Sequence, residues 1–429
     1  MRYLPLTDNE KSQMLATIGV KSVDDLYVNI PASVKAKTKI NLPNHLGEIE
    51  VERKLNSFAN QNLPASDSAF FLGAGCYNHH VPASVDYIIQ RSEFLTSYTP
   101  YQPEIAQGTV QYIFEFQTII ARLTGQEVAN ASMYDGATSM AEAALMALRI
   151  KKDRKKIKLA PKIHPHYVEV LQTYFSNYPE ISIEEGEPCE QTACYIVQSP
   201  NFFGELQNYD SIRQNCDKSG ALMVVVINEI LSLGLVNPPS QADIVCGEAQ
   251  SIGVGMNYGG PHLGFFACKK EYVRTMPGRL CGETIDADGK RSFVLTLSTR
   301  EQHIRREKAT SNICTNQGLM ALAFTVHAEL LGEIGFKQLA KINHAKACQL
   351  FDEITKIKGI KPITKNFFNE FAIELPANIN VVELVEKLSK ENIIAGYAAD
   401  SKTLILCATE LTKDEDIAKL VEALKVKIK

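Results

Sequence analysis

A glycine-rich loop in the middle of the chain has the composition of an active-site loop, yet it lacks the residues that usually perform covalent chemistry. Residues 247–266 read GEAQSIGVGMNYGGPHLGFF and follow an apolar run typical of a strand. The loop contains one histidine, His262, and no lysine or cysteine. Its glycines allow tight backbone turns. The amine or thiol that a covalent mechanism needs must therefore come from elsewhere.

Two tyrosines in a proline-rich turn are the first candidates for a role in binding. Tyr98 and Tyr101 lie in the string SYTPYQPE. A phenolic hydroxyl can orient a substrate carboxylate by hydrogen bonding. Tyrosine is also common at interfaces for its contact area alone, so packing explains the pair equally well.

The string ATSNICTNQG, residues 309–318, is a candidate phosphate-binding turn. Hydroxyl groups and backbone N–H groups at a helix N-terminus favour an anion, and Thr315 is the preferred residue, with Ser311 and Asn312 as alternatives. The preceding string IRREK makes the region locally basic. A solvated run of charges beside a helix is the alternative interpretation.

The remaining motifs favour structural roles. His79 and His80 are adjacent, but only Cys76 stands near them as a possible metal ligand, so loop shaping is favoured over a metal site. The pair Gly253 and Gly255 lacks the third glycine of a dinucleotide fingerprint. The ten cysteines are scattered without a CxxC spacing, which indicates free thiols in a reducing compartment.

Length and composition indicate a soluble protein of several domains. The 429 residues are too many for one simple core, and 45% hydrophobic with 22% charged residues is ordinary for globular proteins. The net charge of -4 and the pI near 6.2 give no indication of nucleic acid or a membrane surface as partner. We find neither an uninterrupted apolar run of the roughly 18 residues that span a bilayer nor a secretory leader at the N-terminus, and we expect a cytoplasmic protein.

The order of elements predicts three regions. Residues 1–65 predict a helical arm, with Thr7 and Glu10 as a capping box. Residues 66–326 alternate helices with strands that are apolar throughout, such as ALMVVVIN, which predicts an α/β domain with a mainly parallel sheet. Residues 327–429 predict a small α+β domain in which FAIEL is a half-buried strand. We further expect capping boxes that start at Ser139 and Thr412.

This layout is shared by fold-type I enzymes, which use pyridoxal phosphate (PLP), and longer strings carry a closer resemblance. The strings SYTPYQPE, MYDGATSMAEAALMA, GEAQSIGVGMNYGGPHLGFFA and REKATSNICT closely resemble the glycine decarboxylase family, the P-protein of the glycine cleavage system. One form of that family is a single chain of about twice this length, and the other is divided into two subunits. The sequence resembles the N-terminal half, subunit 1 (alpha) of the divided form.

The resemblance implies that this chain does not hold PLP itself. In the family, a lysine binds the cofactor covalently and a carboxylate contacts the ring nitrogen. Gln250 stands at the expected lysine position, and the candidate carboxylate strand is followed by Asn228 and Glu229. Asp135 stands at the phosphate-binding turn, where its charge would repel a phosphate; a simple helix-capping role explains it well. We therefore expect PLP to be bound covalently by the partner subunit.

The same resemblance implies the reaction and the partners. Two copies of each subunit would decarboxylate glycine and transfer the aminomethyl group to the lipoyl arm of H-protein. Tyr98, Tyr101 and Thr315, with Ser311 and Asn312 as alternatives, would complete the active site of the partner. Two other interpretations stay open: a self-sufficient homodimeric PLP enzyme, and a purely structural partner subunit.

Overall fold

The computed structural model describes residues 6–38, 41–43, 45–96 and 98–428. The chain divides into two compact units, Met1–Pro64 and Ala65–Lys429. The first unit is a helical arm, and its helices carry no buried residue. Its elements are α1 (Asp8–Ile18), η1 (Val23–Tyr27), α2 (Ala32–Lys35) and α3 (Glu48–Ala59). The predicted capping box is confirmed, because Thr7 and Glu10 bond each other's backbone N–H at 2.6 and 3.2 Å.

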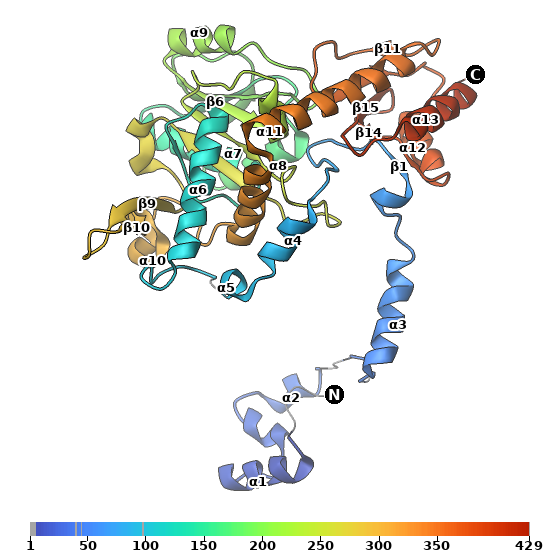
Figure 1. Ribbon diagram of the computed structural model, residues 1–429. Helices are drawn as coiled ribbons and strands as arrows, with labels where there is room; N and C mark the ends of the chain where they lie inside the picture. The colour runs from blue at the N-terminus through green and yellow to red at the C-terminus, as the bar shows by residue number, and fades with distance from the viewer. Residues whose placement is uncertain (1–5, 39–40, 44, 97, 429) are drawn as a thin grey trace. The chain divides into compact units, whose positions relative to one another are not determined.

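A seven-stranded sheet forms the centre of the second unit (Figure 1). The strand order is β2-β8-β7-β6-β5-β3-β4, in which β8 is antiparallel to both of its neighbours and the other pairs are parallel. The strands are β2 (Val128–Ala129), β3 (Lys156–Leu159), β4 (Ser182–Glu185), β5 (Thr192–Gln198), β6 (Leu222–Ile227), β7 (Ile244–Glu248) and β8 (Gly264–Cys268).

Helices cover both faces of this sheet, so its central strands are apolar throughout. Met223 and Val225 of β6 pack in one core with α6, while Val224 and Val226 pack in the other with α7 and α8. This two-sided burial is the reason that the strands show no alternation of polar residues. The helices are α6 (Gln107–Thr124), α7 (Gly136–Ile150), α8 (Pro165–Phe175) and α9 (Tyr209–Ser219).

The C-terminal part carries its own sheet and core. A four-stranded sheet has the order β11-β12-β15-β14, and its core includes apolar residues of α12 and α13. The predicted boundary at residue 326 falls inside α11 (Gly318–Thr355), whose backbone is non-helical at Gly332. The elements are β11 (Lys361–Pro362), β12 (Glu370–Glu374), α12 (Val381–Ser389), β14 (Tyr397–Ala398), β15 (Thr403–Cys407) and α13 (Asp414–Lys427), with β1 (Ala69–Phe70) pairing β13 (Ile393–Ile394).

Shorter elements complete the second unit. The hairpin β9 (Leu280–Ile285) and β10 (Arg291–Thr296) turns through Gly289 and packs against α6. The others are η2 (Ala65–Asp67), α4 (Ala83–Ile89), α5 (Ser92–Leu95), η3 (Ile230–Gly234), η4 (Lys270–Thr275), η5 (Ser298–Arg300), α10 (Gln302–Arg305) and η6 (Arg306–Lys308).

Three local predictions are wrong, each for a physical reason. Helix α7 begins at Gly136 with Asp135 as its cap, so Ser139 lies inside the helix and not at its start. Helix α13 begins after Lys413, and the hydroxyl of Thr412 instead accepts the N–H of Thr409 at 3.0 Å. Strand β12 is buried on both faces and not on one, because Phe371 and Ile373 pack in the C-terminal core on one face and Ala372 packs with Phe202 on the other.

Helix α11 is the one described helix that is long and apolar enough to cross a membrane. Its Ala321 and Phe324 pack in the core on the α6 side of the central sheet, and its Leu350 and Ile354 pack in the C-terminal core. A core helix passes the same test of length and composition. The packing therefore explains the apolar character of α11.

We predict that Gly253→Ala destabilises the fold. The backbone φ of Gly253 is +82°, and a Cβ there would lie 2.4 Å from the carbonyl oxygen of Ala323. Strain and the clash together should lower the free energy of unfolding by roughly 2–4 kcal/mol. Urea unfolding measures the change. The control is Gly108→Ala in α6, where a Cβ meets nothing within 4 Å; an equal loss there would contradict the argument.

Candidate functional site

The ends of β6 and β7 form a buried polar site. Gln250 follows β7 and is 1% exposed; its amide donates to the carbonyl of Val254 at 2.7 Å, and its oxygen accepts the N–H of Tyr77 at 3.4 Å. Asn228 follows β6, is 2% exposed, and its side-chain amide has no hydrogen-bond partner among the described residues. A buried amide without a partner is rare in a folded core, which marks the place as unusual.

A carboxylate lies at the N-terminus of α7. One oxygen of Glu248 accepts the N–H of Gly136 at 3.0 Å, and the other accepts the N–H groups of Gln250 and Leu263 at 3.1 and 2.7 Å. Asp135 caps the same helix by accepting the N–H of Thr138 at 2.8 Å, as the capping interpretation predicted. Burial raises the pKa of Glu248, and the charge of His262 and the N–H groups of Leu263 and Gly136 oppose that shift.

Residues 73–77 pack against the side chains of Gln250, His164 and Asn228. The carbonyl of Ala74 bonds Nε2 of His164 at 2.8 Å. A Cβ on Gly75 would lie 3.0 Å from the His164 ring and 3.6 Å from the amide nitrogen of Asn228. The backbone φ of +93° and this close approach to His164 together favour glycine at residue 75.

The predicted loop histidine His79 lies between two carboxylates. Its ring nitrogens contact Glu229 at 3.0 Å and Glu410 at 2.9 Å. Burial disfavours the charged imidazole, but the two carboxylates outweigh it and raise the pKa of His79 to about 10. The neighbouring His80 has an exposed side chain, and its backbone N–H donates to Glu410. The described residues contain no group of three or more potential metal ligands.

Tyr101 and Thr315 are brought together by an arginine that the sequence analysis did not identify. The guanidinium of Arg279 lies 5.5 Å from the ring centre of Tyr101 and donates to the carbonyl of Thr315 at 3.3 Å. Tyr101 is 52% exposed and Tyr98 is 79% exposed. The backbone N–H of Thr315 lies 3.5 Å from the hydroxyl of Tyr134. The turn that carries Thr315 is therefore held on the edge of the large sheet.

Ser311 and Asn312 face a different feature, a cavity of about 770 Å³ beside α7 and α8. Glu142 lies in its wall with 1% exposure. Burial raises the pKa of Glu142, and the charge of Arg149 and a hydrogen bond from Ser311 oppose it. The structure thus separates the two alternatives from Thr315, which does not line this cavity.

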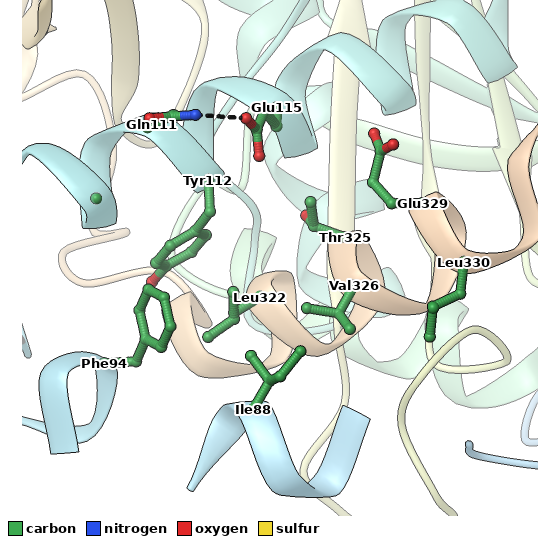
Figure 2. Close-up of a pocket in the computed structure, with 11 residues that line it drawn as sticks. Ile88, Phe94, Gln111, Tyr112, Glu115, Leu322, Thr325, Val326, Glu329 and Leu330 are labelled. Atoms are coloured by element: carbon green, nitrogen blue, oxygen red, sulfur yellow. Dashed lines mark hydrogen bonds between the residues drawn. The ribbon is translucent and has the colours of Figure 1, made fainter. Parts of the chain in front are cut away.

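A second cavity, of about 500 Å³, lies between α4, α5, α6 and α11 (Figure 2). Ile88, Phe94, Leu322 and Val326 form its apolar wall, while Glu115 stands at its edge and accepts a hydrogen bond from Gln111. None of the predicted site residues lines it. The cavity therefore does not add to the candidate site.

Comparison with known proteins agrees with this geometry. The mainly parallel seven-stranded sheet and the C-terminal α+β part define fold type I of the PLP-dependent enzymes; a C-DES variant with glycine covalently linked to its PLP cofactor shares the fold, with a TM-score of 0.57 at 14% identity over 84% of this chain and 96% of that one. The family model of the glycine cleavage system P-protein matches residues 1–424. The chain belongs to this P-protein family.

Two relatives are similar over their whole length. The probable glycine dehydrogenase (decarboxylating) subunit 1 of Beijerinckia indica is 53% identical, with 100% of each chain covered. A crystal structure of glycine decarboxylase (P-protein) of the glycine cleavage system, in inhibitor-bound form, has a TM-score of 0.91 at 40% identity and covers 99% of this chain and 100% of that one.

The residues at the strand ends do not fit PLP. The cofactor needs a lysine, a partner for its ring nitrogen and room for its phosphate at a helix N-terminus. Gln250 stands where the family resemblance places the lysine, and the carboxylate of Glu248 already accepts the N–H of Gly136 at the start of α7. The segment that carries Gly75 packs between His164 and Asn228. An anion and a ring would therefore have to displace groups that are already hydrogen-bonded and packed.

Sequence reasoning missed Glu248 and Arg279. Glu248 stands two residues before Gln250, in the glycine-rich segment 247–266. Only the folded chain places it at the start of α7. Arg279 lies in PGRLCGE, which shows no motif; its burial is a tertiary property. A signal was present for Glu248, because a carboxylate in an otherwise apolar strand end needs donors.

We predict a pH-dependent stability loss for His79→Gln. The raised pKa of His79 means that its ion pairs stabilise the fold fully below the unfolded value of about 6.5 and are lost as pH rises toward the folded value of about 10. The pKa of Glu410 is lowered to about 2, so its contribution is lost only in acid. The variant should cost roughly 3–5 kcal/mol near pH 6, with a smaller cost near pH 9.5.

Urea unfolding of the wild type and the variant at both pH values measures this difference. His80→Gln is the matched control, because His80 is the next residue in the chain and its exposed side chain forms no ion pair with any residue that the structure describes. A cost for His79→Gln that is equal at the two pH values would contradict the assignment of a charged imidazole.

Proposed function

We propose that this chain is subunit 1 of a glycine dehydrogenase (decarboxylating), and that it acts only together with a second subunit that holds PLP covalently. The observation that carries the proposal is the strand-end site, where Gln250 and Glu248 stand in place of a lysine and a phosphate. The name of the Beijerinckia relative, which matches over its full length, supports the assignment.

In the complex, this chain supplies side chains to the active site of its partner. Tyr98 and Tyr101 are exposed, and Thr315 is held beside Tyr101 through Arg279. Exposed tyrosines on a rigid turn suit a contact across an interface. Ser311 and Asn312 face their own cavity and take second place.

The complex contains two copies of each subunit in the cytoplasm. It decarboxylates glycine with the chemistry that PLP supplies on the partner, and it transfers the aminomethyl group to the lipoyl arm of H-protein. These points rest on the family resemblance and on the relative's designation as a subunit.

Two alternatives predict different behaviour. A self-sufficient homodimer would need a lysine at the strand-end site. Gln250 occupies the position that the resemblance gives to the lysine, and it is hydrogen-bonded there. A purely structural subunit would tolerate changes at Tyr98, Tyr101 and Thr315. The experiments below separate these cases.

We expect the isolated chain to bind no PLP, and we expect the same of Gln250→Lys. The substitution supplies an amine, but Glu248 still binds the start of α7 and the segment of Gly75 still packs against His164 and Asn228. The phosphate and the ring of PLP would still have to displace these groups. Each protein is incubated with PLP, reduced with borohydride and analysed by visible absorbance and peptide mass mapping, with subunit 2 as the positive control. A stoichiometric adduct at one lysine of the wild-type chain would overturn the proposal.

In the reconstituted complex we expect Tyr101→Phe and Thr315→Ala each to lower the rate of glycine–bicarbonate exchange by about 10- to 100-fold, or roughly 1.4–2.7 kcal/mol. The reason is the loss of a hydroxyl placed at the partner's site. Tyr178→Phe, a tyrosine that is half exposed elsewhere, is the control. If the Tyr101 and Thr315 variants keep full activity, the structural alternative is correct.

A further inference from the structure

Arg279 is a buried arginine whose contacts hold two separate segments of the candidate site. It is 2% exposed. Its Nε donates to Glu301 at 3.3 Å, and its Nη1 donates both to the carbonyl of Thr315 and to the side chain of Asn316 at 3.3 Å. A planar guanidinium has five donors in a fixed fork, so it can fix several acceptors relative to one another.

Tyr101 is held by the same group through its ring. The guanidinium carbon of Arg279 lies 5.5 Å from the ring centre of Tyr101, and the ring of His303 lies 5.2 Å from it on another side. His303 in turn contacts Glu301 at 3.6 Å. Arg279, Glu301, His303 and Tyr101 thus form a closed ring of contacts. A cation over an aromatic face contributes about 0.5–2 kcal/mol, enough to select one orientation of an otherwise exposed side chain.

The guanidinium is not fully satisfied. Its Nη2 is buried and has no hydrogen-bond acceptor among the described residues. A buried donor without an acceptor costs roughly 1–3 kcal/mol. A role in stability alone would favour an apolar side chain of similar volume here. The donor without an acceptor therefore indicates that Arg279 serves to position neighbouring groups and not only to stabilise the fold.

We propose that Arg279 is the positioning residue of this chain's contribution to the partner's active site: it sets Tyr101 and the Thr315 turn in one fixed geometry. The inference rests on the function proposed above. Arg279 itself touches no substrate. It acts through Tyr101 and through the turn, so it governs the rate of the assembled enzyme more than the binding of glycine.

A double-mutant cycle in the reconstituted complex tests the coupling. Arg279→Met should lower kcat/KM for glycine–bicarbonate exchange by about 10- to 100-fold, because misplacing a positioned group by about 1 Å can cost that much. The loss should fall mainly on kcat. In a Tyr101→Ala background the same substitution should cost at least about threefold less than it does in the wild type, because only the Thr315 turn is left for Arg279 to position.

Arg279→Lys is the conservative variant. It keeps the charge beside Glu301 and loses the fork, so we expect an intermediate loss. Arg291→Met is the matched control, because Arg291 also pairs with a carboxylate, Glu283 at 2.7 Å, and lies 4.9 Å over a ring, that of Phe293. It sits on the exposed β9–β10 hairpin (Figure 1), and the variant should keep wild-type kcat/KM.

A second readout needs no activity. The chain contains no tryptophan, so Tyr101→Trp introduces a single reporter at this place. In the isolated chain, adding Arg279→Met should shift its emission to longer wavelength and increase its quenching by acrylamide, while Arg291→Met leaves both unchanged. This measurement keeps the test valid even where Arg279→Met assembles poorly.

The outcomes separate the two proposals. If the wild-type chain does not raise the exchange activity of subunit 2, the proposed function fails. If the wild-type chain does so but Arg279→Met and Arg279→Lys behave like wild type, the positioning role of Arg279 fails. Equal losses in the wild-type and Tyr101→Ala backgrounds would also overturn it, because they would show that Arg279 does not act through Tyr101.

Discussion

The buried carboxylate of Glu248 is the interaction on which the rest of the strand-end site depends. The start of a helix leaves N–H groups without partners and carries a partial positive charge, so it attracts an anion. Here the anion is part of the chain, and it also binds the N–H groups of Gln250 and Leu263. One side chain therefore ties α7 to β7 and to the glycine-rich loop. The N–H of Gly136 at the start of α7 is thus satisfied within the chain.

The segment around Gly75 completes this closure, and buried charges hold it in place. His79 pairs with Glu229, which follows β6, and with Glu410 of the C-terminal part. Glu370 of β12 accepts the hydroxyl of Tyr77 at 3.0 Å, and burial raises its pKa to about 7. Charges buried this deeply are stable only when paired. The network accordingly fixes the segment between the large sheet and the C-terminal sheet.

The polar side chains that are exposed, and that a partner could contact, lie away from the strand-end site on another part of the second unit. Tyr98 and Tyr101 are exposed, and the Thr315 turn is held at the edge of the large sheet by Arg279 and Tyr134. A site that is closed internally at one place, with exposed and oriented side chains at another, is the arrangement expected of a subunit that completes a partner's active site. The N–H of Gly136 and the side-chain amide of Gln250 are bonded within the chain, whereas Tyr98 and Tyr101 are exposed. We therefore expect the two places to have different roles.

Much of this protein could be predicted from local sequence. The capping box at Thr7 and the apolar strand β6 depend on neighbouring residues, and both are present. The expectation that Gln250 stands at the family's lysine position comes from the family resemblance and not from the local pattern. The predicted caps Ser139 and Thr412 differ from the observed caps Asp135 and Lys413 by four residues and by one, because several nearby residues can start a helix and tertiary contacts choose among them.

The sequence by itself determined the order of elements, the family and the absence of a lysine at residue 250, because these depend on residue type and local spacing. Only the tertiary structure decided which group binds the start of α7, since Gly136 and Glu248 are 112 residues apart in the sequence. It also decided that Arg279 joins Tyr101 to Thr315, and that Ser311 turns to another cavity. Burial and long-range hydrogen bonds set these contacts, and neither is a property of the local sequence.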